Sequence, residues 1–239
     1  MRIKIAPTPL ELSFLLARKI VTGVNECSNE GYHIALSGGS TPKLLFEILA
    51  KEHIEDVDWT KVHFWWGDER CVEPNDDESN FKWVDELLFN HINIPDENIH
   101  RILGETNPLA EAQRYADEIN QCLLSINGNP QFDLIILGMG DDGHTASIFP
   151  YQLELMNSND SCVVAQHPVS GQQRISMTGK VLNHAKETVF LVSGENKADK
   201  VNEIINKEGD YQTYPAAHIQ PENERLYWFL DEAAAQGLR

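Results

Sequence analysis

The sequence predicts an α/β fold, with a mostly parallel central sheet flanked by helices in a single three-layer domain. Short apolar runs alternate with longer amphipathic stretches along the whole chain, which is typical of repeated strand–helix units. No internal repeat, low-complexity tract or Gly/Ser-rich linker divides the chain. A length of 239 residues is enough for one substantial core. We therefore expect residues 1–239 to form one domain.

The apolar runs predict five strands, and the amphipathic stretches between them predict five helices. The predicted strands are Tyr32–Leu36, Val62–Trp66, Leu134–Leu137, Thr188–Val192 and Leu226–Leu230. The predicted helices are Leu10–Val24, Pro42–Ala50, Asn80–Leu88, Leu109–Ser125 and Lys197–Ile205.

Charge and composition narrow the class of partner. The formal net charge of −18 argues against nucleic acid and against an anionic membrane surface, because both are bound by clustered Lys and Arg. A small phosphorylated ligand is compatible with this charge, since a few local cations and a helix N-terminus can hold one phosphate.

The four cysteines are scattered, without a C-x-x-C pair or zinc spacing. No apolar leader or membrane span is evident. We expect a cytoplasmic protein without a metal, and a monomer as the simplest state.

Polar segments follow four of the predicted strands. They are Ser37–Pro42, Gly67–Val72, Gly138–Pro150 and Ser193–Lys197. In open α/β sheets, ligands bind outside the carboxyl ends of the strands. We therefore expect these four segments to form one site.

The first segment, Ser37–Pro42, has the features of an anion-binding turn. Gly38 and Gly39 allow a sharp turn and a close approach of backbone to ligand. Thr41 is a plausible N-cap and Pro42 a good first helical residue, so free N–H groups there would favour a phosphate or an oxyanion. A tight turn without any ligand is the alternative. The Gly-Lys-Ser/Thr ending of a Walker A loop is missing.

The second segment places charged residues directly after a predicted buried strand. Arg70 could grip a phosphate through its planar fork, and Asp68 could orient a histidine or a sugar hydroxyl. The alternative is an ion pair at the surface that caps the strand.

The third segment contains Gly138, Gly140 and Gly143 in the spacing G-x-G-x-x-G, which also occurs in dinucleotide sites. We reject that interpretation because Asp141 and Asp142 would repel a pyrophosphate. In addition, no clear second strand with a terminal acidic residue follows at the required distance.

His144 is better interpreted as a general base. A neutral imidazole can take a proton from water near neutral pH, and a carboxylate from Asp142 or Asp68 would hold the ring.

Arg174 lies just before one apolar segment and Lys197 just after another, in a chain with only 19 basic residues against 37 acidic ones. Both are candidates for a phosphate clamp, although ordinary solvated side chains are the alternative.

Together these segments resemble the 6-phosphogluconolactonase family, from about Ile34 to Trp228. The motifs are Leu-Ser-Gly-Gly-Ser-Thr-Pro at 36–42, Trp-Gly-Asp-Glu-Arg at 66–70 with Ser-Asn at 79–80, Gly-Met-Gly-Asp-Asp-Gly-His-Thr-Ala-Ser-Ile-Phe-Pro at 138–150, Arg-Ile-Ser-Met-Thr at 174–178 and Gly-Glu-Asn-Lys at 194–197. The family often has Pro directly after the Val that follows Asp-Glu-Arg, whereas here Glu73 intervenes before Pro74. That departure concerns the local shape of the loop.

The resemblance implies a Rossmann-like fold and hydrolysis of 6-phospho-D-glucono-1,5-lactone to 6-phosphogluconate in the oxidative pentose phosphate pathway, without a cofactor. It further implies His144 as base with Asp68 and Asp142 as acidic neighbours. On the same basis Arg70, Arg174 and Lys197 face the phosphate, while Gly38, Gly39 and Ser40 line the sugar. No G-x-S-x-G nucleophile elbow occurs.

Three other functions remain as alternatives. A glucosamine-6-phosphate deaminase or isomerase usually carries Asn-Glu after the His loop, where this chain has Thr145–Pro150 with no carboxylate before Glu154. A non-catalytic sugar-phosphate sensor would have kept the pocket and lost the base, but His144 and both aspartates are present. A nicotinamide-dependent dehydrogenase is disfavoured by the acidic third segment.

Overall fold

The computed structural model describes residues 1–28 and 31–238. The strands of the central sheet are β1 (Arg2–Ala6), β2 (Tyr32–Leu36), β3 (Val62–Trp66), β5 (Ile99–His100), β8 (Leu134–Leu137), β11 (Glu187–Val192) and β12 (Leu226–Asp231). The helices are α1 (Pro9–Glu26), α2 (Ser40–Glu52), α3 (Asn80–Leu87), α4 (Pro108–Cys122), α5 (Gly179–Leu182) and α6 (Ala198–Asn206). Two small antiparallel sheets consist of β4 (Asp68–Arg70), β10 (Gln173–Met177) and β9 (Cys162–Gln166), and of β6 (Ser125–Ile126) and β7 (Asn129–Pro130).

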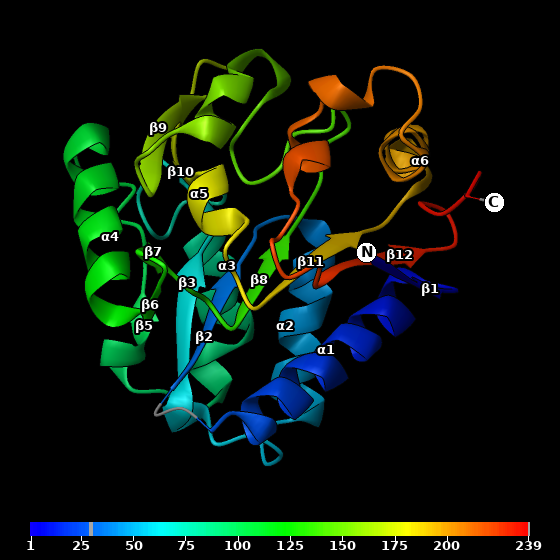
Figure 1. Cartoon of the computed structure of the whole chain (residues 1–239). Helices are drawn as coiled ribbons and strands as arrows, with labels where there is room; N and C mark the ends of the chain where they lie inside the picture. The colour runs from blue at the N-terminus through cyan, green and yellow to red at the C-terminus, as the bar shows by residue number, and fades with distance from the viewer. Residues whose placement is uncertain (29–30, 239) are drawn as a thin grey trace.

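The central sheet is parallel throughout, in the order β1-β12-β11-β8-β2-β3-β5. Helices α1 and α2 pack against each other, and they contact β12 and β11 respectively (Figure 1). Helix α4, at the left of Figure 1, packs against β9 and β10. The predicted α/β architecture with a parallel sheet flanked by helices is confirmed.

The predicted elements are present with small changes at their ends. Strands β2, β3 and β8 have the predicted bounds, while β11 begins one residue before Thr188 and β12 ends one residue after Leu230. All five predicted helices form, and their ends differ from prediction by a turn or less. Helix α1 begins at Pro9 because the Thr8 side chain accepts a hydrogen bond of 3.2 Å from the backbone N–H of Glu11.

The core lies on both faces of the sheet and contains the largest aromatic side chains. Trp65 and Trp66 on β3 and Trp228 on β12 are buried, and Trp228 stacks on Phe190 with 4.2 Å between ring centroids. Burial of each such side chain contributes about 1.5–3 kcal/mol. Tyr115 on α4 fixes the end of β3, since its hydroxyl donates to the carbonyl of Trp66 and accepts from the N–H of Trp66.

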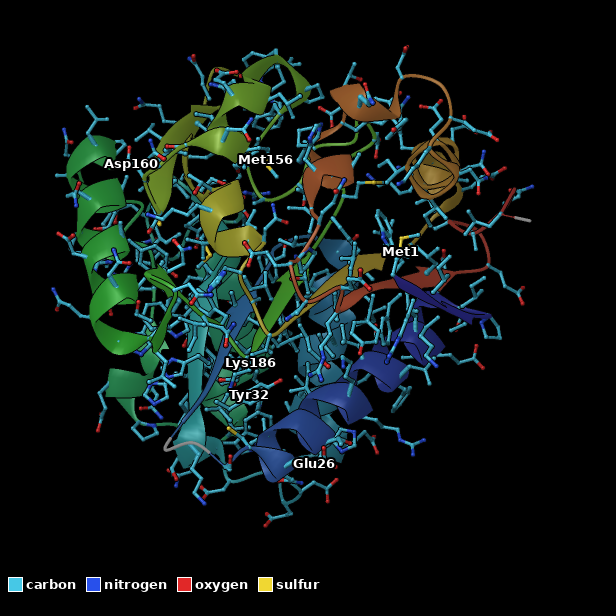
Figure 2. All side chains as sticks on the ribbon, in the orientation of Figure 1. Met1, Glu26, Tyr32, Met156, Asp160 and Lys186 are labelled. Atoms are coloured by element: carbon cyan, nitrogen blue, oxygen red, sulfur yellow. The ribbon has the colours of Figure 1, made fainter. Side chains whose placement is uncertain are left out.

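The amino and carboxyl ends of the central strands lie at opposite ends of the molecule. Figure 2 labels Glu26, Tyr32 and Lys186 near the lower end, where β2 and β11 begin, and Met156 and Asp160 near the upper end. The polar segments that follow the strands lie at the upper, carboxyl end. None of the helices in the described residues combines the length and the apolar composition of a membrane-spanning segment.

Candidate active site

A cavity of about 360 Å³ opens at the carboxyl ends of the central strands. All four polar segments contribute residues to it, so they lie together around one cavity, as the sequence led us to expect. The lining residues include Gly38, Gly39, Ser40, Asp68, Arg70, Asn80, Gly140, His144, Arg174, Ser193, Asn196 and Lys197. Asp142, the remaining predicted site residue, lies beside the cavity through its contact with His144.

The start of α2 supplies backbone N–H groups to this cavity. Gly39 is the N-cap with φ 114°, and no side chain caps the helix. The prediction that Thr41 is the N-cap and Pro42 the first helical residue is therefore wrong. The positive φ, which glycine adopts readily, lets the helix begin at Ser40. The Thr41 hydroxyl instead lies 2.6 Å from the Ser193 hydroxyl.

Asp68 and Arg70 belong to a short strand, where the sequence suggested only a polar loop. Strand β4 pairs antiparallel with β10, and Arg70 lies opposite Arg174 while Asp68 lies opposite Ser176. Directly opposed residues share one face of a sheet, and so do residues two apart on a strand. Asp68, Arg70 and Arg174 are therefore presented together to the cavity.

Glu69 points to the other face of β4 and anchors the strand. Its carboxylate accepts hydrogen bonds from the backbone N–H groups of Arg70, Asn80 and Phe81, and from the Ser79 hydroxyl, at 2.7 to 3.1 Å. Burial raises the pKa of Glu69, and the backbone N–H donors offset part of that rise. The start of α3 is thus tied to β4 by a buried carboxylate, which suits the positive end of a helix.

Asp68 is held by a serine rather than by the histidine. The Ser147 hydroxyl donates a hydrogen bond of 2.6 Å to Oδ2 of Asp68, and both side chains are buried. Asn80 donates from its amide to the Asp68 carbonyl at 2.9 Å. Of the two carboxylates that the sequence offered as partners for His144, Asp68 is therefore not the one in contact.

Asp142 is the carboxylate that contacts His144. Its Oδ1 lies 2.6 Å from Nδ1 of His144 and also accepts from the His144 backbone N–H at 3.1 Å. Burial alone would raise the pKa of Asp142, but the hydrogen bond and charge of His144 leave that pKa below its ordinary value. Because Nδ1 is engaged by Asp142, Nε2 is the ring nitrogen left for a reacting group.

The loop around His144 is fixed by its own backbone. The N–H of Gly140 donates to the His144 carbonyl at 2.9 Å, and the Thr145 hydroxyl donates to the Gly138 carbonyl at 2.8 Å. A Cβ at Gly140 would lie 2.1 Å from Nδ1 of His144, so only glycine fits under the ring. No helix follows β8 before Pro150, in contrast to a dinucleotide-binding turn.

Arg70 and Arg174 form a pair of cations on one wall. The Nε atoms of both are buried without a hydrogen-bond partner among the described residues. Burial lowers the pKa of Arg174, Asp68 offsets part of that effect, and Arg70 adds to it. Two adjacent guanidinium groups repel each other, so an anion placed between them is strongly favoured.

Lys197 stands apart from the two arginines, although it lines the same cavity. Its ammonium pairs with Asp141, which also accepts from the amide of Asn196 at 2.9 Å. The hydrogen bond from Lys197 lowers the pKa of Asp141. Asp141 is thus the partner of Lys197, whereas Asp142 is the partner of His144.

Three residues at this site were not predicted as functional. Asn80 lines the cavity close to Gly38, where a Cβ would lie 1.7 Å from its Oδ1. Ser147 positions Asp68, and Asn196 supports Asp141. The only sequence signal for them is their place inside the motifs.

Among residues 1–28 and 31–238, no His, Cys, Asp and Glu side chains are grouped so as to hold a metal ion. Burial raises the pKa of Cys71 to about 11, so this thiol stays protonated near neutral pH.

The sequence and the fold both match known proteins. Residues 7–228 match the family model of glucosamine-6-phosphate isomerases/6-phosphogluconolactonase. The 6-phosphogluconolactonase of Haemophilus influenzae is 50% identical over 209 residues, which are 87% of this chain and 88% of that protein. A crystal structure of a devB protein is 45% identical, covers 100% of this chain and 99% of that chain, and has a TM-score of 0.94.

A further solved structure extends the likeness to a more distant relative. The 6-phosphogluconolactonase of Thermotoga maritima is 28% identical, covers 97% of this chain and 99% of that chain, and has a TM-score of 0.83. The family model spans two activities, whereas the relative that is 50% identical over 209 residues is a 6-phosphogluconolactonase. The chain therefore belongs to the 6-phosphogluconolactonase family, within the superfamily that also contains the glucosamine-6-phosphate isomerases.

Proposed function

We propose that the chain is a 6-phosphogluconolactonase, a hydrolase that converts 6-phospho-D-glucono-1,5-lactone to 6-phosphogluconate in the oxidative pentose phosphate pathway. The observation that carries this proposal is the placement of His144 in the same cavity as the two arginines, with Nδ1 held 2.6 Å from Asp142. A base and an anion clamp across one cavity suit hydrolysis of a phosphorylated ester.

The 6-phosphate binds to the Arg70 and Arg174 pair. Both guanidinium groups lie on the same face of the small sheet, and their planar forks match phosphate oxygens. Lys197, on the wall formed by the segment after β11, adds a third positive charge in reach of the ligand. Binding at the phosphate positions the lactone carbonyl, so remote binding energy is used for orientation at the reacting carbon.

His144 acts as the general base. Nε2 removes a proton from a water molecule, which attacks C1 of the lactone, while Asp142 stabilises the imidazolium. The negative charge on the carbonyl oxygen is stabilised by the free N–H groups at the start of α2, where Gly39 and Ser40 line the cavity without a side-chain cap. His144 then returns the proton to the departing ring oxygen.

Asp68 binds a sugar hydroxyl. Its Oδ2 accepts from Ser147, and Asp68 also lines the cavity. The second carboxylate oxygen is therefore free to accept a hydrogen bond from the substrate. Gly38 also lines the cavity and is required there by Asn80, whose Oδ1 would lie 1.7 Å from a Cβ at this position.

Substrate choice tests the proposed reaction directly. Freshly generated 6-phosphogluconolactone is mixed with the protein in weak buffer, and proton release is followed against the spontaneous rate. A parallel assay supplies glucosamine 6-phosphate and measures ammonia. We expect accelerated acid production with the lactone and no ammonia. Ammonia release without acceleration of lactone hydrolysis would assign the chain to the deaminase branch instead.

A further inference from the structure

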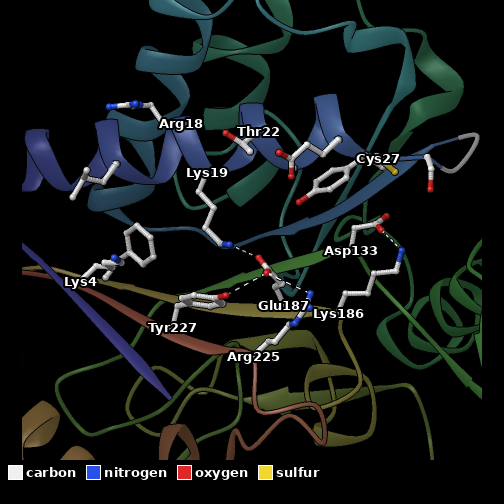
Figure 3. A pocket seen from close by; sticks show the side chains of 16 residues that line it. Lys4, Arg18, Lys19, Thr22, Cys27, Asp133, Lys186, Glu187, Arg225 and Tyr227 are labelled. Carbon is white, nitrogen blue, oxygen red and sulfur yellow. Dashed lines mark hydrogen bonds and ion pairs between the residues drawn. The ribbon is translucent and has the colours of Figure 1, made fainter.

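We propose that a second cavity, at the opposite end of the sheet from the catalytic one, binds a small phosphorylated anion. This cavity has a volume of about 650 Å³ and lies between α1 and the strands β1, β12, β11 and β2 (Figure 3). None of its lining residues belongs to the catalytic cavity. It is a separate site by position as well as by composition.

Cations are concentrated around this cavity. Five basic residues line it, namely Lys4, Arg18, Lys19, Lys186 and Arg225, together with three acidic ones, Glu26, Asp133 and Glu187. The balance of five positive and three negative charges gives a local net charge of +2, in a chain whose net charge is −18. A cavity of this sign in an acidic protein attracts anions.

Three of the five cations pair with two carboxylates of the lining. Lys19 pairs with Glu187, and Nη1 of Arg225 lies 3.9 Å from the other oxygen of Glu187. Nζ of Lys186 lies 2.6 Å from Oδ1 of Asp133, and Figure 3 shows these pairs along one side of the cavity. A lysine offers three donors and an arginine five, so two carboxylates leave many of them available to a phosphate.

Buried aromatic rings supply an apolar surface beside these donors. Tyr32, Tyr227 and Phe229 line the cavity and are buried. The Lys19 ammonium lies 4.3 Å from the centroid of the Tyr227 ring, and the Tyr227 hydroxyl donates to Glu187 at 3.3 Å. Burial, together with Asp133 and Glu187, raises the pKa of Tyr32, which keeps its hydroxyl a donor. An occupant with a phosphate and a compact carbon body fits such a lining.

The cavity is too far from the catalytic one for a shared ligand. Glu187 is the first residue of β11, and Val192, at the other end of this strand, lines the catalytic cavity. A strand rise of about 3.3 Å per residue places these two residues about 17 Å apart. A small ligand bound here therefore does not contact a lactone bound in the catalytic cavity.

Inorganic pyrophosphate serves as the probe, titrated by calorimetry at pH 7.5 and constant ionic strength. The double variant Arg70→Ala/Arg174→Ala removes the arginine pair and so weakens anion binding in the catalytic cavity, and all further variants are made in that background. Lys19→Gln should weaken pyrophosphate binding about threefold to tenfold, because it removes a positive charge at short range. Glu187→Gln should tighten binding by a similar factor, because it frees Lys19 and Arg225 from a competing carboxylate.

Changes of opposite sign in pyrophosphate affinity distinguish a binding site from a structural ion-pair network. Either substitution breaks the Lys19–Glu187 pair, so a purely structural role predicts effects of the same sign. Lys51→Gln, at an exposed pair with Glu47, is the matched control and should leave binding unchanged. Circular dichroism melting verifies that each variant is folded.

Two results would overturn the proposal. One is loss of all pyrophosphate binding in the Arg70→Ala/Arg174→Ala background, which would leave a single anion site. The other is a failure of Lys19→Gln and Glu187→Gln to change affinity in opposite directions. Lactonase assays on Lys19→Gln and Glu187→Gln in the otherwise wild-type chain, without pyrophosphate, should match wild type. A missing lactonase activity in the wild type would count against the catalytic proposal alone.

Discussion

The Ser147 hydroxyl donates a hydrogen bond of 2.6 Å to Oδ2 of Asp68, and neither side chain is more than 4% exposed. A buried carboxylate that loses its donor bears a desolvation cost of about 1–3 kcal/mol. This pair connects the His144 loop to the strand that carries Arg70, since Ser147 lies three residues after the histidine. The position of Asp68 in the cavity therefore depends on a residue that does not line it.

Ser147→Ala should lower kcat/KM for the lactone by about tenfold, because Asp68 loses the partner that fixes its carboxylate. Steady-state proton release measures the effect, and thermal unfolding reports any loss of stability. Ser170→Ala, at an exposed serine, is the control and should change neither. Wild-type kinetics in Ser147→Ala would show that Asp68 needs no such support.

Gly140→Ala should reduce activity much more than Gly138→Ala. A Cβ at Gly140 would lie 2.1 Å from Nδ1 and 2.2 Å from Cε1 of His144, whereas a Cβ at Gly138 would lie 3.6 Å from the Ser37 hydroxyl. The first methyl group displaces the imidazole from Asp142, and the second makes an ordinary contact. Loss of general-base alignment costs about 10²–10⁴ in rate. Comparable kcat values for the two variants would contradict the proposed role of the His144 loop.

Arg174→Ala should raise KM for the phosphorylated lactone at least tenfold, because one half of the arginine pair is lost. Arg174→Lys should restore part of the affinity by returning the charge without the fork. The decisive comparison is glucono-1,5-lactone, which has no phosphate and whose hydrolysis should be unaffected by either change. An equal loss with both lactones would place Arg174 at the reacting carbon instead of the phosphate.

Stability should fall as pH falls from about 6.5 towards 4, with His33 as one cause. Burial, together with the neighbouring His63, lowers the pKa of His33 to about 4, and Asp133 opposes the change only in part. Between that value and the ordinary pKa of 6.5, the unfolded chain binds a proton that the folded chain does not. Each unit of pH in this window therefore removes up to about 1.4 kcal/mol of the free energy of unfolding.

His33→Asn should flatten this pH dependence. The asparagine oxygen can replace Nδ1 of His33 as acceptor for the Trp65 indole N–H, which now donates to it at 3.2 Å. Urea unfolding at several pH values between 7 and 4.5 gives the slope. His91→Asn, at an exposed histidine, should leave the slope as in wild type. The burial of His63 also lowers its pKa, so part of the slope should persist in His33→Asn.

The central strands could be predicted from sequence because their residues are apolar and contiguous. Tyr32–Leu36 and Val62–Trp66 are buried at nearly every position, so the local pattern was sufficient. β1 was missed because it is an exposed edge strand, whose single partner β12 lies at the other end of the chain. Strand β4 was missed because its three residues are charged and become a strand only through pairing with β10, over a hundred residues away.

The site was predictable as a set of residues but not as a set of contacts. The motifs brought His144, Arg70 and Arg174 to one cavity as expected. The sequence could not decide between Asp142 and Asp68 as the partner of His144, since both follow from plausible loop shapes. The structure resolves this choice, because Asp142 contacts Nδ1 of His144 while Asp68 accepts from Ser147. The predicted N-cap of α2 was also wrong, because the sequence does not reveal that Gly39 has a positive φ.

The most direct test of the account is proton release from fresh 6-phosphogluconolactone by His144→Ala. We expect the wild-type protein to accelerate acid production. The kcat of the variant should be lower by a factor of about 10²–10⁴, the usual contribution of a general base, and its circular dichroism spectrum should be unchanged. His167→Ala, whose ring packs on Phe149 as His144 does, should remain active. A folded His144→Ala with wild-type kcat would contradict the assignment of His144 as the base.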